Sequence, residues 1–237
     1  MASAFKANAP ITIKMIQVHQ VSFSYDELSV LEKVSFRVER GEFAFLVGPS
    51  GSGKTTLLRL LYADLAPIGG EMSVVGQQLA ELNKVNLPYF RQKIGIVFQD
   101  FKLLADKTVK ENLALPQKLV GTAPRLLKDN VNEILHQMGL SHHQNARPAE
   151  ISNNERRKLA IARAIINKPL LLIADAPTEG LDLRLSLEVM ALLDALNFQG
   201  MTVFIATADR KLAEKCNKRI IELKDGAIRW DPSSASI

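Results

Sequence analysis

The sequence has a single cysteine, Cys216, so no disulfide can form within the chain. This excludes the small disulfide-rich secreted folds and suits a reducing compartment, where we expect Cys216 to be a small apolar side chain late in the fold. No stretch approaches the roughly 18 apolar residues that a membrane-spanning helix needs. Residues 1–14 lack the continuous apolar run of a signal peptide. We therefore predict an N-terminal extension over 1–14, followed by a single domain over 15–237.

Aromatic residues are scarce, at 6%, and no block of like charge stands out. The net charge is +5, but the basic residues are dispersed and not interleaved with aromatic ones, so we expect no nucleic-acid binding. Hydrophobic residues make up 47% and charged residues 23%, which is ordinary for a globular protein and argues against disorder.

Two kinds of apolar pattern are present. Ile16–Phe23 and Val34–Val38 alternate between apolar and polar residues, which predicts half-exposed strands. Phe43–Val47, Leu170–Ala174 and Met201–Ala206 are instead nearly continuous apolar runs, as expected for strands buried on both faces.

Helical spacing separates these buried runs. Thr55–Tyr62 and Leu183–Leu196 are predicted helices, and strands alternating with helices indicate a parallel sheet covered on both faces. The middle section, roughly Asp106 to Ile151, contains no buried run; Val131–Met138 is an amphipathic pattern ended by Gly139. The sequence thus predicts an α/β core with a helical insertion.

A glycine-rich segment directly follows the first buried strand. It matches G-x-x-x-x-G-K-[ST] and comprises Gly48, Pro49, Ser50, Gly51, Ser52, Gly53, Lys54 and Thr55, with Thr56 next to it. Its backbone N–H groups and the start of the following helix would surround phosphate oxygens. Lys54 would reach the β- and γ-phosphates, and the Thr55 hydroxyl would bind Mg²⁺. This pattern in this context predicts a site for a nucleoside triphosphate.

Asp175 ends the second buried run, where a Mg²⁺-binding aspartate of the Walker B type would lie. An aspartate at the end of a strand is otherwise a common cap of a turn or helix. Its occurrence together with the phosphate-binding segment favours the metal role.

Nearly the whole chain, from about Ile16 to Trp230, resembles the ABC ATPases. The resemblance implies a P-loop NTPase fold with a mainly parallel core sheet, an antiparallel β subdomain and a helical subdomain over roughly 101–160. It implies ATP and Mg²⁺ as cofactors, with Tyr25 stacking on adenine and Gln99 near Mg²⁺, facing a membrane partner. Ile151–Glu155 resembles the family's signature segment, and Leu181–Asp182 resembles its D-loop.

Within that family, Val97–Leu104 and Lys107–Asn112 are similar to the FtsE group of cell-division ATP-binding subunits. This implies a peripheral subunit on the cytoplasmic face of the plasma membrane, bound to an FtsX-like membrane protein, with division-ring proteins as further candidate partners. Subunits of lipoprotein-release and macrolide-export transporters share much of these stretches and remain an alternative. A soluble P-loop kinase is disfavoured because the chain has the ABC element order and no acceptor-substrate motif.

The chain departs from the family pattern at all three elements that act on the γ-phosphate. Ala176 replaces the acidic residue that polarises water, and Ala208 replaces the switch histidine. Asn153-Asn154 replaces the two signature glycines, although Ser152 and Glu155 keep the spacing of a capping box. Glu179 lies nearby, but the turn at Pro177 makes it a poor substitute for the missing acid.

From these departures we expect a protein that binds Mg-ATP but hydrolyses it slowly or not at all, since losing a positioned base commonly costs about 10² to 10⁴ in rate. Such a protein would be a nucleotide-gated scaffold rather than a motor. Because ABC nucleotide sites are composite, a homodimer or an ABC heterodimer is expected. The chain's histidines show no metal-ligand spacing and are expected at the surface: His19, His136, His142 and His143.

Overall fold

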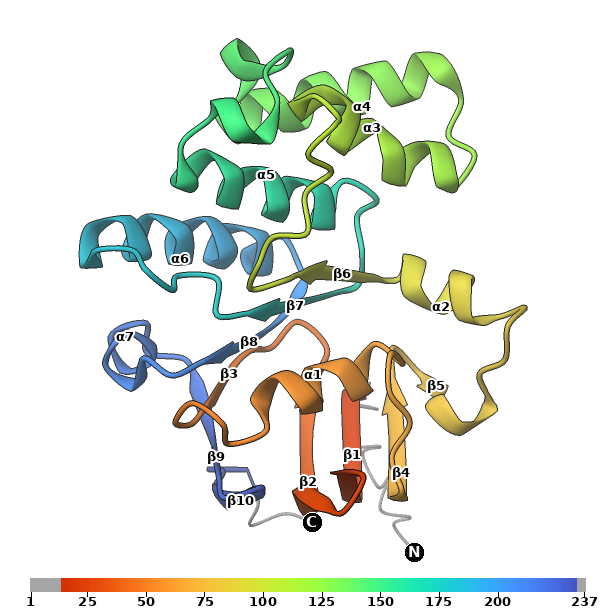
Figure 1. Cartoon of the computed structure of the whole chain (residues 1–237), viewed down its shortest axis with the longest axis vertical. Helices are drawn as coiled ribbons and strands as arrows, with labels where there is room; N and C mark the ends of the chain where they lie inside the picture. The colour runs from red at the N-terminus through yellow and green to blue at the C-terminus, as the bar shows by residue number, and fades with distance from the viewer. Residues whose placement is uncertain (1–13, 234–237) are drawn as a thin grey trace, which may run out of the picture.

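The computed structural model describes residues 14–233, and the N-terminal extension predicted over 1–14 therefore lies, apart from Lys14, outside the described residues. Within this range the strands form two sheets, with helices between them and along one side (Figure 1). No helix among the described residues is long and apolar enough to cross a membrane.

The smaller sheet is antiparallel and has the strand order β2-β1-β4-β5. It is made of β1 (Lys14–Tyr25), β2 (Leu28–Glu39), β4 (Gly69–Val74) and β5 (Gln77–Gln78). In β1 and β2 buried residues alternate with more exposed ones along much of each strand, as the sequence pattern predicts. This sheet is the antiparallel β subdomain that the family resemblance implied.

The larger sheet has the order β10-β9-β3-β8-β7-β6, and its strands are parallel except for β10. Its members are β3 (Phe43–Val47), β6 (Ile94–Val97), β7 (Leu171–Asp175), β8 (Thr202–Thr207), β9 (Arg219–Lys224) and β10 (Ala227–Trp230). The three continuous apolar runs of the sequence become β3, β7 and β8. All five residues of β3 are buried, as predicted.

The two faces of β3 belong to two different hydrophobic clusters. Ala44 and Leu46 pack in a cluster that includes α1 (Lys54–Leu61) and the antiparallel sheet. Phe43, Phe45 and Val47 pack in the other cluster, which includes α6 (Leu183–Phe198) and α7 (Arg210–Lys215). The helix α1 is thus held between the two sheets, directly behind the phosphate-binding segment (Figure 1).

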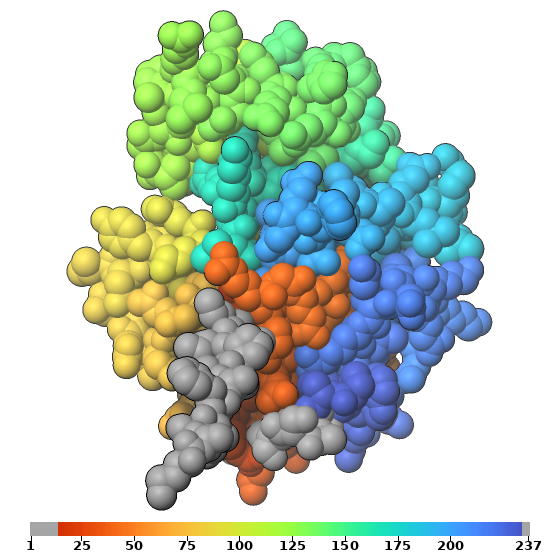
Figure 2. Space-filling model, turned by 180° about the vertical axis from the view of Figure 1, so that it is seen from behind, coloured from red at the N-terminus to blue at the C-terminus, as the bar shows by residue number. Residues whose placement is uncertain are grey.

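The part of the chain between β6 and β7 is helical. It contains α3 (Val109–Leu119), α4 (Pro124–Gln137) and α5 (Asn153–Ile165), with short 3₁₀ turns at Ser141–His143 and Pro148–Glu150. Its helices gather at one end of the molecule, as the view from behind also shows (Figure 2). The helix predicted at residues 131–138 is the C-terminal half of α4.

Elements that the sequence patterns missed complete the fold. Among them are β4, β5, β6, β9, β10, α3, α7, the 3₁₀ turn Leu79–Glu81 and α2 (Leu87–Gln92). Gly95 interrupts the apolar run of β6, and a Cβ at that position would lie 2.5 Å from the Ala164 carbonyl oxygen of α5. The residue that hides this strand from pattern analysis therefore allows α5 to pack against it.

Candidate functional site

The glycine-rich segment turns sharply between the end of β3 and the start of α1. Gly51 and Gly53 have φ values of 81° and 97°, in the left-handed region that favours glycine. Gly48 is needed for a different reason: a Cβ there would lie 2.1 Å from the Leu223 carbonyl oxygen of β9. No side chain caps the N-terminus of α1, so backbone N–H groups of its first turn are available to an anion.

The side chain of Lys54 turns back over this loop. Its Nζ donates hydrogen bonds of 2.8 Å to the carbonyl oxygens of both Gly48 and Pro49. Partial burial lowers the pKa of Lys54, and the nearby Asp175 carboxylate opposes that shift. The loop therefore holds a partly desolvated cation close to its own backbone amides, which is suited to binding phosphate.

Thr55 and Asp175 meet although they are far apart in the sequence. The Thr55 hydroxyl donates a hydrogen bond of 2.7 Å to Asp175 Oδ2 at the end of β7. Burial raises the pKa of Asp175 above its ordinary value, while the Thr55 hydrogen bond and the Lys54 charge act in the opposite direction. The structure thus brings together the hydroxyl and carboxylate oxygens that a hard cation such as Mg²⁺ prefers. Thr56, the next residue, is buried on α1.

Gln99 lies just after β6, the strand that pairs with β7. Gln99 Nε2 donates a hydrogen bond of 2.6 Å to Glu179 Oε2. Both residues line a cleft of about 1010 Å³, together with Thr55 and Asp175. Gln99 is therefore placed in the same cleft as the other two predicted Mg²⁺ ligands, and its amide Nε2 is hydrogen-bonded to a carboxylate.

Tyr25 lies at the end of β1, with its ring half-exposed. The ring packs edge-on against Phe23, with centroids 4.9 Å apart, and the Arg59 guanidinium on α1 donates a 3.1 Å hydrogen bond to its hydroxyl. Arg59 follows Lys54 on the same helix, so Tyr25 is anchored to the helix that begins at the phosphate-binding loop.

Two positions expected to act on the γ-phosphate, Ala176 and Ala208, lack reactive side chains. Ala176 has a φ of 45°, and its N–H donates a 2.9 Å hydrogen bond to the Ala206 carbonyl oxygen. Ala208 follows β8, and the next residue, Asp209, caps α7 by accepting a hydrogen bond from the Leu212 N–H. Methyl groups at both positions can neither accept a proton nor orient water.

The start of α5 has the predicted capping box. Ser152 Oγ accepts a hydrogen bond from the Glu155 N–H, and Glu155 Oε2 accepts one of 2.7 Å from the Ser152 N–H. Asn153 and Asn154 form the first turn of the helix. The helix start is therefore intact despite the asparagines.

Two arginines on α5 were not predicted as part of the site. Buried Arg157 donates hydrogen bonds to the carbonyl oxygens of Pro177 and Glu179, and Arg163 donates to those of Phe101 and Lys102. These contacts tie α5 to the segments that follow β7 and β6. The accepting carbonyl oxygens are 20 or more residues away from the arginines, so no local pattern indicated these contacts.

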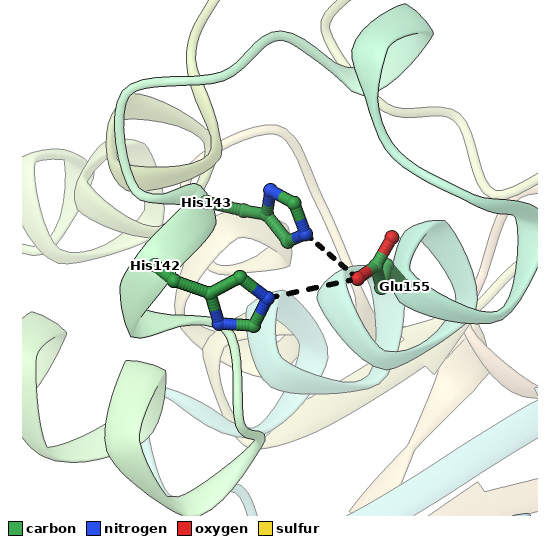
Figure 3. Close-up of side chains that lie close together, drawn as sticks. All are labelled: His142, His143 and Glu155. Carbon is green, nitrogen blue, oxygen red and sulfur yellow. Dashed lines mark ion pairs between the residues drawn. The ribbon is translucent and has the colours of Figure 1, made fainter.

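Two of the histidines have a neighbour that the sequence did not indicate. His142 and His143 lie beside Glu155, and His143 Nε2 is 2.8 Å from Glu155 Oε1 (Figure 3). His19 and His136 are exposed, as expected. The consecutive histidines and the glutamate are twelve residues apart, a spacing that is not recognisable as a ligand pattern without the fold.

The chain is similar in sequence to known proteins over most of its length. The family model described as ABC transporter matches residues 31–179. The cell division ATP-binding protein FtsE of Streptococcus pneumoniae serotype 2 is 40% identical, with 93% of this chain and 96% of that protein covered. The protein of the same name from Bacillus subtilis is 38% identical, with 92% and 96% covered.

A solved structure with the same fold is an ATP-binding cassette in a dimeric, post-hydrolysis state bound to ADP and Pi. It has a TM-score of 0.83 and is 32% identical, with 92% of this chain and 97% of that chain covered. The predicted P-loop NTPase fold is confirmed. The chain belongs to the ABC transporter family of ATP-binding domains, and its relatives include FtsE proteins.

Proposed function

We propose that this chain is the ATP-binding subunit of an FtsEX-like complex that acts in cell division and cell-wall remodelling. The observation that carries the proposal is the Thr55–Asp175 hydrogen bond of 2.7 Å beside the Lys54 side chain, which assembles a phosphate and metal site. The similarity to FtsE proteins over more than nine-tenths of the chain supports the cellular role.

In this proposal ATP binds along the loop between β3 and α1. Tyr25 stacks on adenine, and residues 48–56 surround the phosphates, with backbone N–H groups of the loop and of the first turn of α1 as donors. Lys54 exchanges its carbonyl partners for β- and γ-phosphate oxygens. Thr55, Asp175 and Gln99 surround Mg²⁺, with Gln99 binding through its amide oxygen Oε1 because its Nε2 donates to Glu179.

We further propose that the protein works at the cytoplasmic face of the plasma membrane, held there by an FtsX-like integral membrane protein. It would act as a homodimer or as a heterodimer with a related ABC subunit, and division-ring proteins are further candidate partners. The dimeric state of the similar cassette supports this arrangement.

The reactive step is the part that we propose is weak. Ala176 and Ala208 leave the γ-phosphate without the acidic and imidazole side chains that the family uses, so ATP is hydrolysed slowly or not at all. ATP occupancy would then stabilise an assembly without turnover, as a nucleotide-gated scaffold does.

Single-turnover measurements with the purified chain test this proposal, alone and with its membrane partner. We expect saturable Mg-ATP binding and a phosphate-release rate far below 1 s⁻¹, compared with typical enzyme turnover of 1 to 10³ s⁻¹. Turnover near 1 s⁻¹ or above contradicts the scaffold role, whereas absent Mg-ATP binding contradicts the proposed function as a whole. Co-purification with a lipoprotein-release or macrolide-export partner in place of an FtsX-like protein would contradict the cell-division role.

A further inference from the structure

We propose that His142, His143 and Glu155 form a binding site for a Zn²⁺ ion at the start of α5. The two histidines end the 3₁₀ turn Ser141–His143, and Glu155 lies in the first turn of α5. The Nε2 atoms of both imidazoles point toward the same carboxylate oxygen, Glu155 Oε1 (Figure 3).

The distances suit a small transition-metal ion. His143 Nε2 lies 2.8 Å and His142 Nε2 3.9 Å from Glu155 Oε1, and one ligand atom from each residue falls within 4.8 Å of the others. Ligand atoms at 2.0–2.2 Å from a tetrahedral Zn²⁺ lie roughly 3.3–3.6 Å from one another. Shifts on the order of 1 Å in these side chains, of which His142 is largely exposed, would produce that geometry.

Glu155 can bind a metal without giving up its structural role. Its Oε2 accepts the hydrogen bond from the Ser152 N–H, while Oε1 faces the imidazoles. The hydrogen bonds from Ser152 are the main cause that lowers the pKa of Glu155, and His143 adds to the shift. The carboxylate is therefore ionised at neutral pH, which is the form that a metal requires.

The donor set selects the ion. Two imidazoles and one carboxylate are a recognised zinc ligand set, and they leave a fourth position for water. Imidazole suits Zn²⁺, Cu²⁺ and Ni²⁺, whereas Mg²⁺ prefers oxygen ligands. The site would thus remain available to zinc in the presence of the Mg²⁺ that the nucleotide site requires.

The location gives the site a structural consequence. The ion would join the turn after α4 to the first turn of α5, which contains Asn153 and Asn154. Zinc would therefore hold this first turn against residues 141–143. The inference does not depend on the proposed function, because none of the three residues lines the cleft that contains Thr55 and Asp175.

Calorimetric titration of the nucleotide-free full-length chain with ZnCl₂ in excess MgCl₂ tests the site. We expect one zinc ion per chain, bound at least about tenfold more weakly by His142→Ala and by His143→Ala, since even residues outside the ligand set typically contribute 10- to 100-fold to metal affinity. Glu155→Gln should also weaken binding, although glutamine can still complete the capping box.

Two control variants should bind zinc as the natural chain does: His19→Ala, on β1, and Cys216→Ser, at the end of α7. Zinc should also shift the imidazole NMR signals of His142 and His143 but not that of His19, a measurement that needs no substitution. The proposal is overturned if the natural chain binds no zinc, if His142→Ala/His143→Ala binds it with unchanged affinity, or if Cys216→Ser abolishes binding.

Discussion

The two sides of the nucleotide cleft differ in the functional side chains that they contain. On the β3–α1 side, binding depends on the backbone of a loop with positive-φ glycines and on two side chains, Lys54 and Thr55. On the side after β7 and β8, positions 176 and 208 are alanines, whose side chains are methyl groups. The proposed function rests on this difference, because the groups that would bind phosphate are present whereas positions 176 and 208 have no side chain that could assist hydrolysis.

The largest effect is expected when the alanines at 176 and 208 are replaced by the side chains that the family uses. Ala176→Glu combined with Ala208→His should raise ATP turnover by about 10² to 10⁴, the usual contribution of a positioned general base. Ala176 already has a Cβ at a φ of 45°, so glutamate adds little backbone strain. Phosphate release under saturating Mg-ATP measures the effect.

The control is the same double variant carrying Lys54→Ala, which should remain inactive. If the restored chain hydrolyses ATP no faster than the natural one, the two alanines are not what limits hydrolysis. In that case the asparagines at 153 and 154 become the next positions to change.

Removing the Lys54 charge should weaken nucleotide binding on the β3–α1 side of the cleft. Lys54→Ala should weaken Mg-ATP binding roughly 10- to 150-fold, because hydrogen bonds to charged groups contribute about 1.5–3 kcal/mol each. Fluorescent-nucleotide titration measures the change, and Lys128→Ala, at an exposed lysine of α4, is the matched control. Equal affinities of the two variants would contradict the role given to Lys54.

On the other side of the cleft, the hydrogen bonds from Arg157 of α5 to the segment after β7 are expected to stabilise the fold. Arg157→Met should lower the free energy of unfolding by about 1–3 kcal/mol, since it leaves the carbonyl oxygens of Pro177 and Glu179 without their donor. Denaturant unfolding measures the loss. Arg125→Met, at an exposed arginine of α4, should change stability by less than about 0.5 kcal/mol.

Asp175 is expected to produce the smallest effect, and its sign depends on pH. The folded state raises the pKa of Asp175 above 3.8, so the carboxyl contributes stability below that value and loses the contribution as pH rises through the folded-state pKa. In the absence of nucleotide, Asp175→Asn should therefore be slightly more stable than the natural chain at pH 7, but not in strong acid.

Thermal unfolding across pH tests this expectation, with Mg-ATP added in a second series. Mg-ATP should stabilise the natural chain more than the variant, because the variant lacks the metal-binding carboxylate. A variant that is less stable than the natural chain at pH 7 without nucleotide would mean that the carboxylate is favourably held in the fold.

Strands with uninterrupted apolar runs were predictable, and those whose identity depends on neighbours were not. β3, β7 and β8 are recognisable because both faces of each are buried. β6 was not predicted because Gly95, which packs closely against α5, interrupts its apolar run. β4 was not predicted because it begins with two exposed glycines. A glycine that is required where two backbone segments pack closely adds nothing to a hydrophobic pattern.

The candidate site divides in the same way. The loop from Gly48 to Thr55 was predictable, because its chemistry depends on contiguous residues at fixed spacing. The partners of Arg157 and the meeting of His143 with Glu155 depend on how α5 packs and starts. The link between Gln99 and Glu179 likewise joins residues 80 positions apart.

The pairing of β3 has a consequence for how the protein is made. Its two neighbours in the sheet, β8 and β9, come from the C-terminal quarter of the chain. A ribosome must therefore synthesise most of the protein before the strand that leads into the phosphate-binding loop gains either neighbour. Such long-range pairing folds slowly and exposes strand edges to aggregation. Nascent chains truncated before β8 should accordingly be unable to retain ATP, which makes nucleotide capture a late marker of completed biosynthesis.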